Sequence, residues 1–240
     1  MTSYRLQICP TAEDLARQGA EQIASLIDQA LGERDRVQIA LAGGETPRAA
    51  YSLLARQHLP WDRVDVLLGD ERWVPAEDPS SNALMLRQTL LAAGQPGSEA
   101  RFHPVPTHLA DPVAGADAMA TLLETLCPGI PPQLDLVLLG LGDDGHTASL
   151  FPGTRAPEVN DRWTTIGEGK GLPRVSLTAP VLSAARRVLF LVSGSGKQQA
   201  LRRLLDPAED PRRTPARLVQ PAQEVLVLAD QAAAAGLASG

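Results

Sequence analysis

Two carboxylates and an imidazole directly follow an apolar segment near the middle of the sequence. Residues 134–139 read Leu-Asp-Leu-Val-Leu-Leu, and a Gly-Leu-Gly turn then leads to Asp143, Asp144 and His146. An imidazole changes its charge near neutral pH, and a nearby carboxylate can orient it or tune its basicity. Because a strand end, glycines, an acid and an imidazole converge here, the segment predicts proton chemistry at His146, with Asp144 close enough to influence it.

A second candidate site is a glycine turn that follows another predicted strand. Gly43 and Gly44 allow the backbone to come close to a ligand, and the N–H groups at the start of the next helix favour an anion. Thr46 is expected to cap that helix and Pro47 to fit its first turn. Glu45 would repel an anion and is therefore expected to point outward. The turn predicts phosphate binding, with a plain strand-to-helix connection as the alternative.

Cationic side chains follow three further segments that could reach the same edge of a sheet. Arg72 comes after Asp70 and Glu71, and its guanidinium can bind a phosphate or carboxylate through two hydrogen bonds. Its alternative role is a surface ion pair with one of those acids. Lys197 lies in the first turn of a predicted helix, where it could hold a phosphate or simply be solvated. Arg174 is a further candidate anion contact.

Three motifs of other enzyme classes are out of context, incomplete or absent in this sequence. Residues 140–145 satisfy the GxGxxG pattern, but they follow a late strand and carry two acids where a pyrophosphate would lie. Residues 192–197 are similar to a nucleotide-binding P-loop, yet Leu191 replaces its first glycine and Gln198 its magnesium-binding hydroxyl residue. No G-x-S-x-G sequence is present. Dinucleotide binding, a P-loop nucleotide site and a nucleophilic serine elbow are therefore rejected.

The elements that must position these residues alternate between short apolar strands and amphipathic helices. This alternation is typical of an α/β fold with a mainly parallel sheet and helices on both faces, which is a doubly wound arrangement. With no repeat and no boundary, residues 1–240 are predicted to form a single domain. The predicted helices cover residues 11–31, 47–56, 81–91, 113–127 and 195–205; the predicted strands cover 37–42, 64–68, 134–139, 188–192 and 225–228. Residues 92–109 are expected to be a loop with one short strand, and residues 206–215 an exposed loop.

The composition excludes several classes of function. The 240 residues carry 22 basic and 28 acidic side chains, a net charge of -6, which disfavours nonspecific binding to nucleic acid. Aromatic residues make up only 3% of the chain, so few side chains are present to stack on bases. Neither the first residues nor any apolar run has the character of a secretion signal or a membrane span. We therefore expect a soluble cytoplasmic protein without a nucleic-acid or membrane partner.

The two cysteines do not indicate a metal or disulfide site. Cys9 and Cys127 lie far apart in the sequence and form no CxxC pair. They are expected to be small, semi-buried core residues. The other three histidines stand in ordinary contexts and are expected to be structural.

The motifs, taken in chain order, resemble those of the 6-phosphogluconolactonase family. The matching segments are Leu41–Gly44 with Thr46–Pro47, Asp70–Arg72 with Val74–Pro75 and Ser81–Asn82, Gly140–Pro152, Arg174–Thr178, and Gly194 with Lys197. The resemblance implies a Rossmann-like fold similar to that of glucosamine-6-phosphate deaminase. It further implies hydrolysis of 6-phospho-D-glucono-1,5-lactone to 6-phosphogluconate in the oxidative pentose phosphate pathway, without a metal or an organic cofactor.

The same resemblance implies a role for each candidate residue. His146 would be the catalytic base and Asp144 its neighbouring functional acid, while Arg72 and Lys197 would bind the substrate phosphate. Substrate contacts would also come from Gly43, Gly44, Thr46, Asp70 and Arg174. Glu45 departs from the serine usual in the family, which places a side-chain contact there in doubt. Arg72 is also a candidate to stabilise the oxyanion. We expect a monomer or weak homodimer.

Two other functions remain open from the sequence. An amino-sugar phosphate isomerase or deaminase would use Asp and His in a similar crevice, whereas the uninterrupted sequence from Gly145 to Pro152 favours the lactonase. A noncatalytic sugar-phosphate sensor would keep the anion contacts without the proton chemistry, and the Asp144/His146 pair argues against it.

Overall fold

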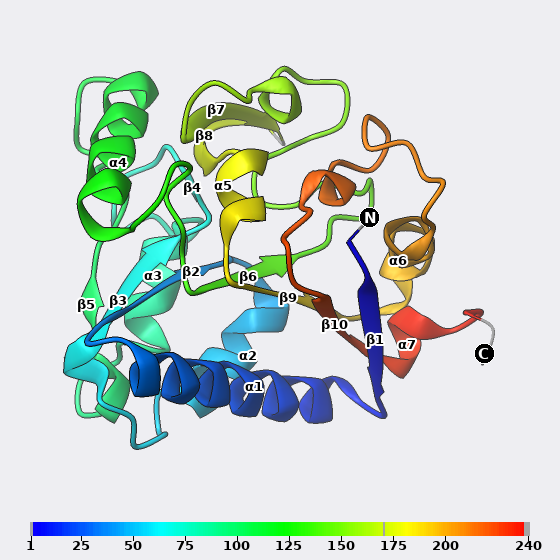
Figure 1. Ribbon diagram of the computed structural model, residues 1–240, viewed down its shortest axis with the longest axis horizontal. Coiled ribbons are helices and arrows are strands. Elements are labelled where there is room, and N and C mark those ends of the chain that lie inside the picture. Colours follow the sequence, from blue (N-terminus) through cyan, green and yellow to red (C-terminus); the bar gives the residue numbers. More distant parts are fainter. Residues whose placement is uncertain (1, 170, 238–240) are drawn as a thin grey trace.

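The computed structural model describes residues 2–169 and 171–237, and a seven-stranded parallel sheet forms its centre (Figure 1). The strands lie in the order β1-β10-β9-β6-β2-β3-β5. Their bounds are β1 Tyr4–Cys9, β2 Val37–Leu41, β3 Val64–Leu68, β5 Arg101–Phe102, β6 Leu136–Gly140, β9 Arg187–Val192 and β10 Val225–Asp230. Strands β2, β3 and β10 are mainly apolar and buried along their whole length, because helices cover both faces of the sheet.

The order of the strands reverses between β2 and β6. From β2 the chain continues outward through β3 to β5, and it then returns to place β6 on the other side of β2. The loops that leave the carboxyl ends of β2 and β6 therefore diverge to opposite faces of the sheet, and a crevice forms between them. This crevice is where the glycine turn, Gly43–Thr46, meets residues 141–148, which carry His146 and are here called the histidine loop.

Helices cover the sheet on two sides, as predicted (Figure 1). One apolar core joins the sheet to α1, α2 and α3, and the other joins it to α4, α5, α6 and α7. The helices are α1 Ala12–Glu33, α2 Glu45–Leu54, α3 Asn82–Gln88, α4 Pro112–Leu126, α5 Ala179–Ala184, α6 Gln198–Leu205 and α7 Gln231–Ala234. The predicted α/β class with a doubly wound, mainly parallel sheet is confirmed.

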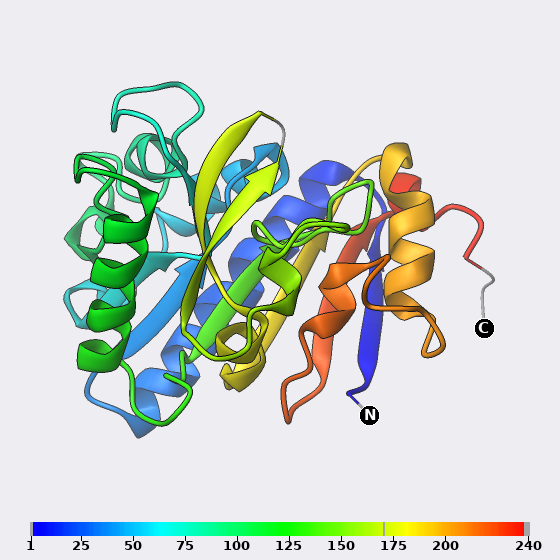
Figure 2. The ribbon, with the colours of Figure 1, turned by 90° about the horizontal axis from the view of Figure 1, so that it is seen from above.

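A small antiparallel sheet lies over one face of the large sheet (Figure 2). Its order is β4-β8-β7, with bounds β4 Asp70–Arg72, β8 Leu172–Leu177 and β7 Thr164–Gly169. Helix α4 packs against β7 and β8. Because β4 follows β3 after one residue, the small sheet begins at the carboxyl edge of the large one. It brings the residues of β4 and β8 to the crevice.

The predicted elements agree with the structure except at several positions. Helix α1 has Thr11 as its N-cap, with the side chain accepting a hydrogen bond from the Asp14 amide at 3.1 Å, but it continues past Gly32. The short strand expected within residues 92–109 is β5. Strands β1, β4, β7 and β8 and helices α5 and α7 were not predicted. The prediction for residues 206–215 is partly wrong, because Glu209 and Thr214 are buried there.

Within residues 2–169 and 171–237, none of the helices is both long enough and apolar enough to cross a membrane.

Candidate active site

A cavity of about 350 Å³ lies at the carboxyl ends of β2, β6 and β9 and contains almost all the predicted site residues. The residues from the large sheet follow the ends of these strands, as expected for a doubly wound fold. Those from the small sheet lie on β4 and β8. The predicted residues that line it are Gly43, Gly44, Thr46, Asp70, Arg72, His146, Arg174 and Lys197. Asp144 does not line the cavity, but it holds the ring of His146.

The loop after β6 orients the imidazole of His146. Its Nδ1 lies 2.6 Å from Oδ1 of Asp144, and the same oxygen accepts the His146 backbone N–H at 3.0 Å. Since an ionised carboxylate only accepts hydrogen bonds, this contact places the proton of a neutral ring on Nδ1 and the lone pair on Nε2. On the ring face, Phe151 lies 4.3 Å away between ring centroids. The side chain of His146 is therefore fixed from two directions.

Backbone contacts fold this loop tightly around the histidine. The Gly142 N–H donates to the His146 carbonyl at 2.8 Å. A Cβ on Gly142 would lie 2.0 Å from His146 Nδ1, a distance at which the ring would have to move. Gly145 has φ of +94°, a conformation that glycine adopts without steric cost. Ala148 has φ of +47°, which costs a non-glycine residue about 1 kcal/mol.

The glycine turn after β2 is held by two buried side chains. The hydroxyl of Tyr51 donates to the Ala42 carbonyl at 2.8 Å. Asn82 packs against Gly43 so closely that a Cβ there would lie 1.9 Å from the Asn82 amide oxygen. Asn82 also lines the cavity, and its amide donates to the Asp70 carbonyl at 2.8 Å. Only glycine at position 43 leaves room for this amide.

The predicted capping role of Thr46 is wrong, because the helix begins earlier. The N-cap of α2 is Gly44, with φ of +111°, and the helix runs from Glu45. Thr46 thus lies within the first turn, where backbone N–H groups lack helical acceptors. Glu45 is among the residues that line the cavity; its side chain is 86% exposed and its carboxylate lies 3.3 Å from the Arg48 guanidinium.

Asp70 and Arg174 form a buried pair beneath the cavity. A guanidinium nitrogen of Arg174 lies 3.5 Å from Asp70 Oδ2, and the same oxygen accepts the Ser149 hydroxyl at 2.5 Å. Burial lowers the pKa of Arg174, and the charge of Asp70 opposes this shift. The Arg174 guanidinium also lies 5.4 Å from the centre of the Phe151 ring. The Asp70 carboxylate thereby pairs with the Arg174 guanidinium at the wall of the cavity.

Arg72 is positioned by its neighbour Glu71, a residue for which sequence reasoning assigned no separate role. The buried Glu71 carboxylate accepts the backbone N–H groups of Arg72, Asn82 and Ala83 at 2.7–2.8 Å. Burial raises the pKa of Glu71, while these three N–H groups lower it. The Arg72 guanidinium donates to the Ser80 carbonyl. The surface ion pair considered for Arg72 is absent from the ion pairs of the described residues.

Lys197 ends a single turn of 3-10 helix, Ser195–Lys197, that precedes α6. Its ammonium donates to the carboxylate of Asp143, which belongs to the histidine loop. The Lys197 side chain is only about one quarter exposed. This ion pair joins the segment after β9 to the segment after β6, so a cation and the imidazole lie at one cavity.

Two residues that line or support the cavity were not singled out from the sequence. Asn82 and Phe151 both lie within the matching segments, but their types alone suggest a helix start and a core aromatic. Their roles follow from the packing of Asn82 on Gly43 and of Phe151 on His146. Neither contact has a signature in the spacing of the sequence.

Other groups with reactive chemistry lie outside this site. Cys9 and Cys127 are buried thiols, and burial raises the pKa of Cys127 to about 12, so it stays protonated at neutral pH. His103 lies 2.9 Å from the Asp65 carboxylate, away from the cavity. No group of three or more His, Cys, Asp or Glu side chains suited to a metal ion occurs in residues 2–169 and 171–237.

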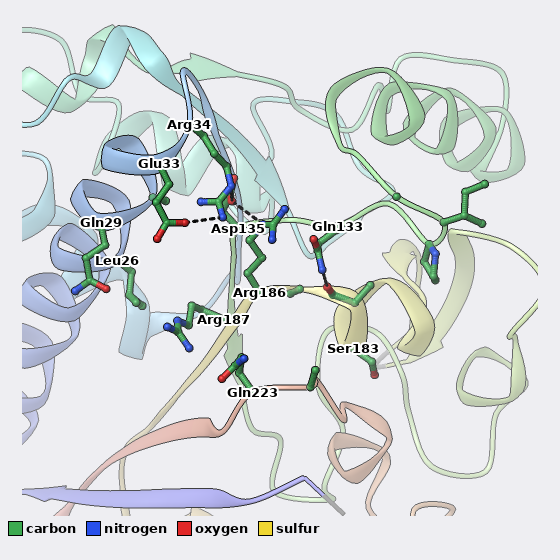
Figure 3. A pocket seen from close by; sticks show the side chains of 17 residues that line it. Leu26, Gln29, Glu33, Arg34, Gln133, Asp135, Ser183, Arg186, Arg187 and Gln223 are labelled. Atoms are coloured by element: carbon green, nitrogen blue, oxygen red, sulfur yellow. Dashed lines mark hydrogen bonds and ion pairs between the residues drawn. The ribbon is translucent and has the colours of Figure 1, made fainter.

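A second cavity, of about 520 Å³, lies at the opposite, amino end of the strands (Figure 3). Arg34 and Arg186 approach Asp135 from two sides at 3.3–3.4 Å, and Arg34 also pairs with Glu33 at 3.0 Å (Figure 3). These guanidinium groups are thus already matched by carboxylates. None of the residues predicted for catalysis or binding lines this cavity.

Known proteins with similar sequences and structures share this architecture. Residues 10–228 match the family described as glucosamine-6-phosphate isomerases/6-phosphogluconolactonase. A 6-phosphogluconolactonase of Synechocystis sp. is 45% identical over 90% of this chain and 90% of its own length, and one of Nostoc sp. is 41% identical over 97% and 98%. The solved structure of 6-phosphogluconolactonase from Trypanosoma brucei has a TM-score of 0.88 and 28% identity, and covers 99% of this chain and 100% of that chain. The chain therefore belongs to the glucosamine-6-phosphate isomerase/6-phosphogluconolactonase family.

Proposed function

We propose that this protein hydrolyses 6-phospho-D-glucono-1,5-lactone to 6-phospho-D-gluconate in the oxidative pentose phosphate pathway. The observation that carries the proposal is one cavity that holds both an imidazole oriented by a carboxylate and the cations Lys197, Arg72 and Arg174. The imidazole of His146 can activate water, and the three cations can bind a phosphate. Relatives named 6-phosphogluconolactonase at 45% and 41% identity support this choice.

The histidine would act as a general base towards water. Neutral His146 takes a proton through Nε2 from the water that attacks the lactone carbonyl carbon C1. The imidazolium that forms is stabilised by Asp144 at Nδ1. As the bond from C1 to the ring oxygen breaks, His146 returns the proton to that oxygen, and the carboxylic acid ionises. A reactive lactone held close to a positioned water needs no covalent intermediate.

The phosphate would bind at the opposite end of the ligand. Lys197 supplies an ammonium, and the turn from Gly43 to Thr46 supplies backbone N–H groups at the start of α2. Arg72 and Arg174 extend this positive region along β4 and β8. The oxyanion that forms at C1 needs a donor as well, and Arg72 is our candidate for it.

Replacing Lys197 with alanine is expected to weaken substrate binding more than catalysis. A charge-assisted hydrogen bond contributes about 1.5–3 kcal/mol, so KM should rise by at least about tenfold while kcat changes little. Initial rates of lactone hydrolysis over a range of substrate concentrations give both constants. Gln198→Ala, which alters the next residue of the same segment, is the control; an unchanged KM in Lys197→Ala would remove the lysine from the phosphate site.

A coupled assay tests the proposed function directly. Lactone hydrolysis is followed at slightly acid pH, where spontaneous opening is slow, by oxidation of the product with 6-phosphogluconate dehydrogenase. We expect a rate well above background. Ammonia release from glucosamine 6-phosphate would instead establish the deaminase, and binding of the lactone without turnover would establish a sensor.

The proposal also covers the compartment and the oligomeric state of the enzyme. It acts as one catalytic domain in the cytoplasm, as a monomer or weak homodimer, on a sugar-phosphate lactone and without a nucleic-acid or membrane partner. Light scattering at several protein concentrations checks the oligomeric state.

A further inference from the structure

The segment 209–216, here called the brace, packs against the histidine loop although the two are far apart in the sequence. The Ala216 N–H donates to the Gly145 carbonyl at 3.0 Å. A Cβ on Gly145 would lie 3.0 Å from both Cα and Cγ2 of Thr214. Gly145 directly precedes His146. The position of the brace therefore limits where the histidine loop can lie.

A buried carboxylate holds the brace in its folded form. Glu209 is 6% exposed and Thr214 is fully buried. The Thr214 hydroxyl donates to Glu209 Oε1 at 2.6 Å, and the same oxygen accepts the Arg213 Nε at 2.8 Å. A second nitrogen of Arg213 donates to Oε2. These bonds fix Thr214, which in turn contacts Gly145.

A second contact reaches the histidine loop from the same region. Arg203, on α6, donates to the Asp143 carbonyl at 3.3 Å. The loop is thus supported on both sides of Asp144, at Asp143 and at Gly145. Neither support lines the cavity: Arg203 and the brace are both absent from its wall.

We propose that Glu209 is a positioning residue for the reaction, acting through Thr214 and Gly145 on His146. The proposal rests on the proposed function. Loss of the Glu209 contacts lets Thr214 shift, the Gly145 backbone follows, and the Nε2 atom of His146 moves relative to the attacking water. Because a displacement of about 1 Å can lower a rate by about 10²-fold, even a partial loosening should reduce kcat.

The test compares three variants of the full chain. Glu209→Gln removes the charge, Thr214→Val removes only the hydroxyl that bonds to Glu209, and Asp210→Asn is the control. Asp210 lies in the same turn, but its carboxylate pairs with the exposed Arg212. Each variant is first checked for folding by circular dichroism, and then kcat, KM and the ¹H–¹⁵N signals of the histidine rings are measured.

We expect kcat to fall about tenfold in Glu209→Gln and in Thr214→Val, with KM within about twofold of the original and the His146 ring signals shifted. Asp210→Asn should match the original protein. Folded Glu209→Gln and Thr214→Val with unchanged kcat and unchanged ring signals would overturn the proposal. If the original protein has no lactonase activity, the proposed function is refuted. The positioning contact is then tested by the His146 ring signals alone, because these do not depend on any substrate.

Stability should depend on pH through the same carboxylate. The hydrogen bond from Arg213 holds the pKa of Glu209 at about 2, below its ordinary value of 4.5; burial opposes this shift, and Thr214 and Arg203 favour it. A lowered folded-state pKa stabilises the protein above the unfolded value, and that stability is lost as pH falls through 4.5 towards 2. The Tm difference between the original protein and Glu209→Gln should therefore be larger at pH 7 than at pH 3. An equal difference at both values would contradict this assignment.

Discussion

Replacing His146 with alanine is expected to lower kcat for lactone hydrolysis by about 10²–10⁴-fold while KM changes little. In the proposed mechanism the imidazole takes the proton from water, and its orientation depends on the 2.6 Å contact with Asp144. The proposed phosphate site at Lys197 and at the glycine turn is unchanged in the variant. Substrate therefore still binds, but water must attack without a base. Steady-state kinetics at several pH values measure both constants.

His103→Ala is a matched control for this experiment. His103 also pairs with a carboxylate, Asp65, but it lies away from the cavity. We expect this variant to lose some stability and to retain the kcat of the original protein. A near-original kcat in His146→Ala would remove the histidine from the mechanism, and a matching loss in His103→Ala would show that the effect reflects general destabilisation.

A single methyl group at Gly142 is expected to lower kcat by about 10²-fold. The added Cβ would lie 2.0 Å from His146 Nδ1 and 2.7 Å from Asp144 Oδ1, so the ring and the carboxylate would have to separate. Both the position of Nε2 and the assignment of the proton to Nδ1 depend on the contact between His146 Nδ1 and Asp144 Oδ1. A displacement of the reacting group by about 1 Å is sufficient to lower a rate by about 10²-fold. The ¹H–¹⁵N signals of the His146 ring should shift in the same variant.

Gly32→Ala separates this effect from the general cost of the substitution. No heavy atom lies within 4 Å of a Cβ built at Gly32, and this glycine is in the last turn of α1. We expect unchanged kcat in Gly32→Ala. If Gly142→Ala also kept its full kcat and its His146 ring signals, the close packing of the loop would have no part in catalysis.

The sequence could predict that the site residues gather at the carboxyl ends of the strands, because this arrangement follows from the topology of the sheet. The segments 37–42, 134–139 and 188–192 form parallel strands. The residues that follow these strands must therefore meet at the carboxyl edge of the sheet. The apolar character of those segments was enough to identify them, since helices bury both of their faces. For this reason the sequence alone predicts that the histidine loop, the glycine turn and Lys197 lie close together.

Contacts between distant segments could not be predicted in this way. Strand β8, which carries Arg174, is only partly apolar and forms its pairs with β4 and β7 in a separate antiparallel sheet. Glu209 lies in a segment rich in proline and charge, which indicated an exposed loop, yet its carboxylate is buried by Thr214 and Arg213. The partners that bury such polar groups come from tertiary packing, which has no local periodicity.

The central claim is that one ligand spans the cavity from His146 to Lys197. A crystal structure with 6-phospho-D-gluconate tests it most directly. The account predicts the carboxylate carbon C1 beside Nε2 of His146 and the phosphate on Lys197 and the turn from Gly43 to Thr46. A product bound with its phosphate at His146, or found only in the cavity around Asp135 and Arg186, would contradict it.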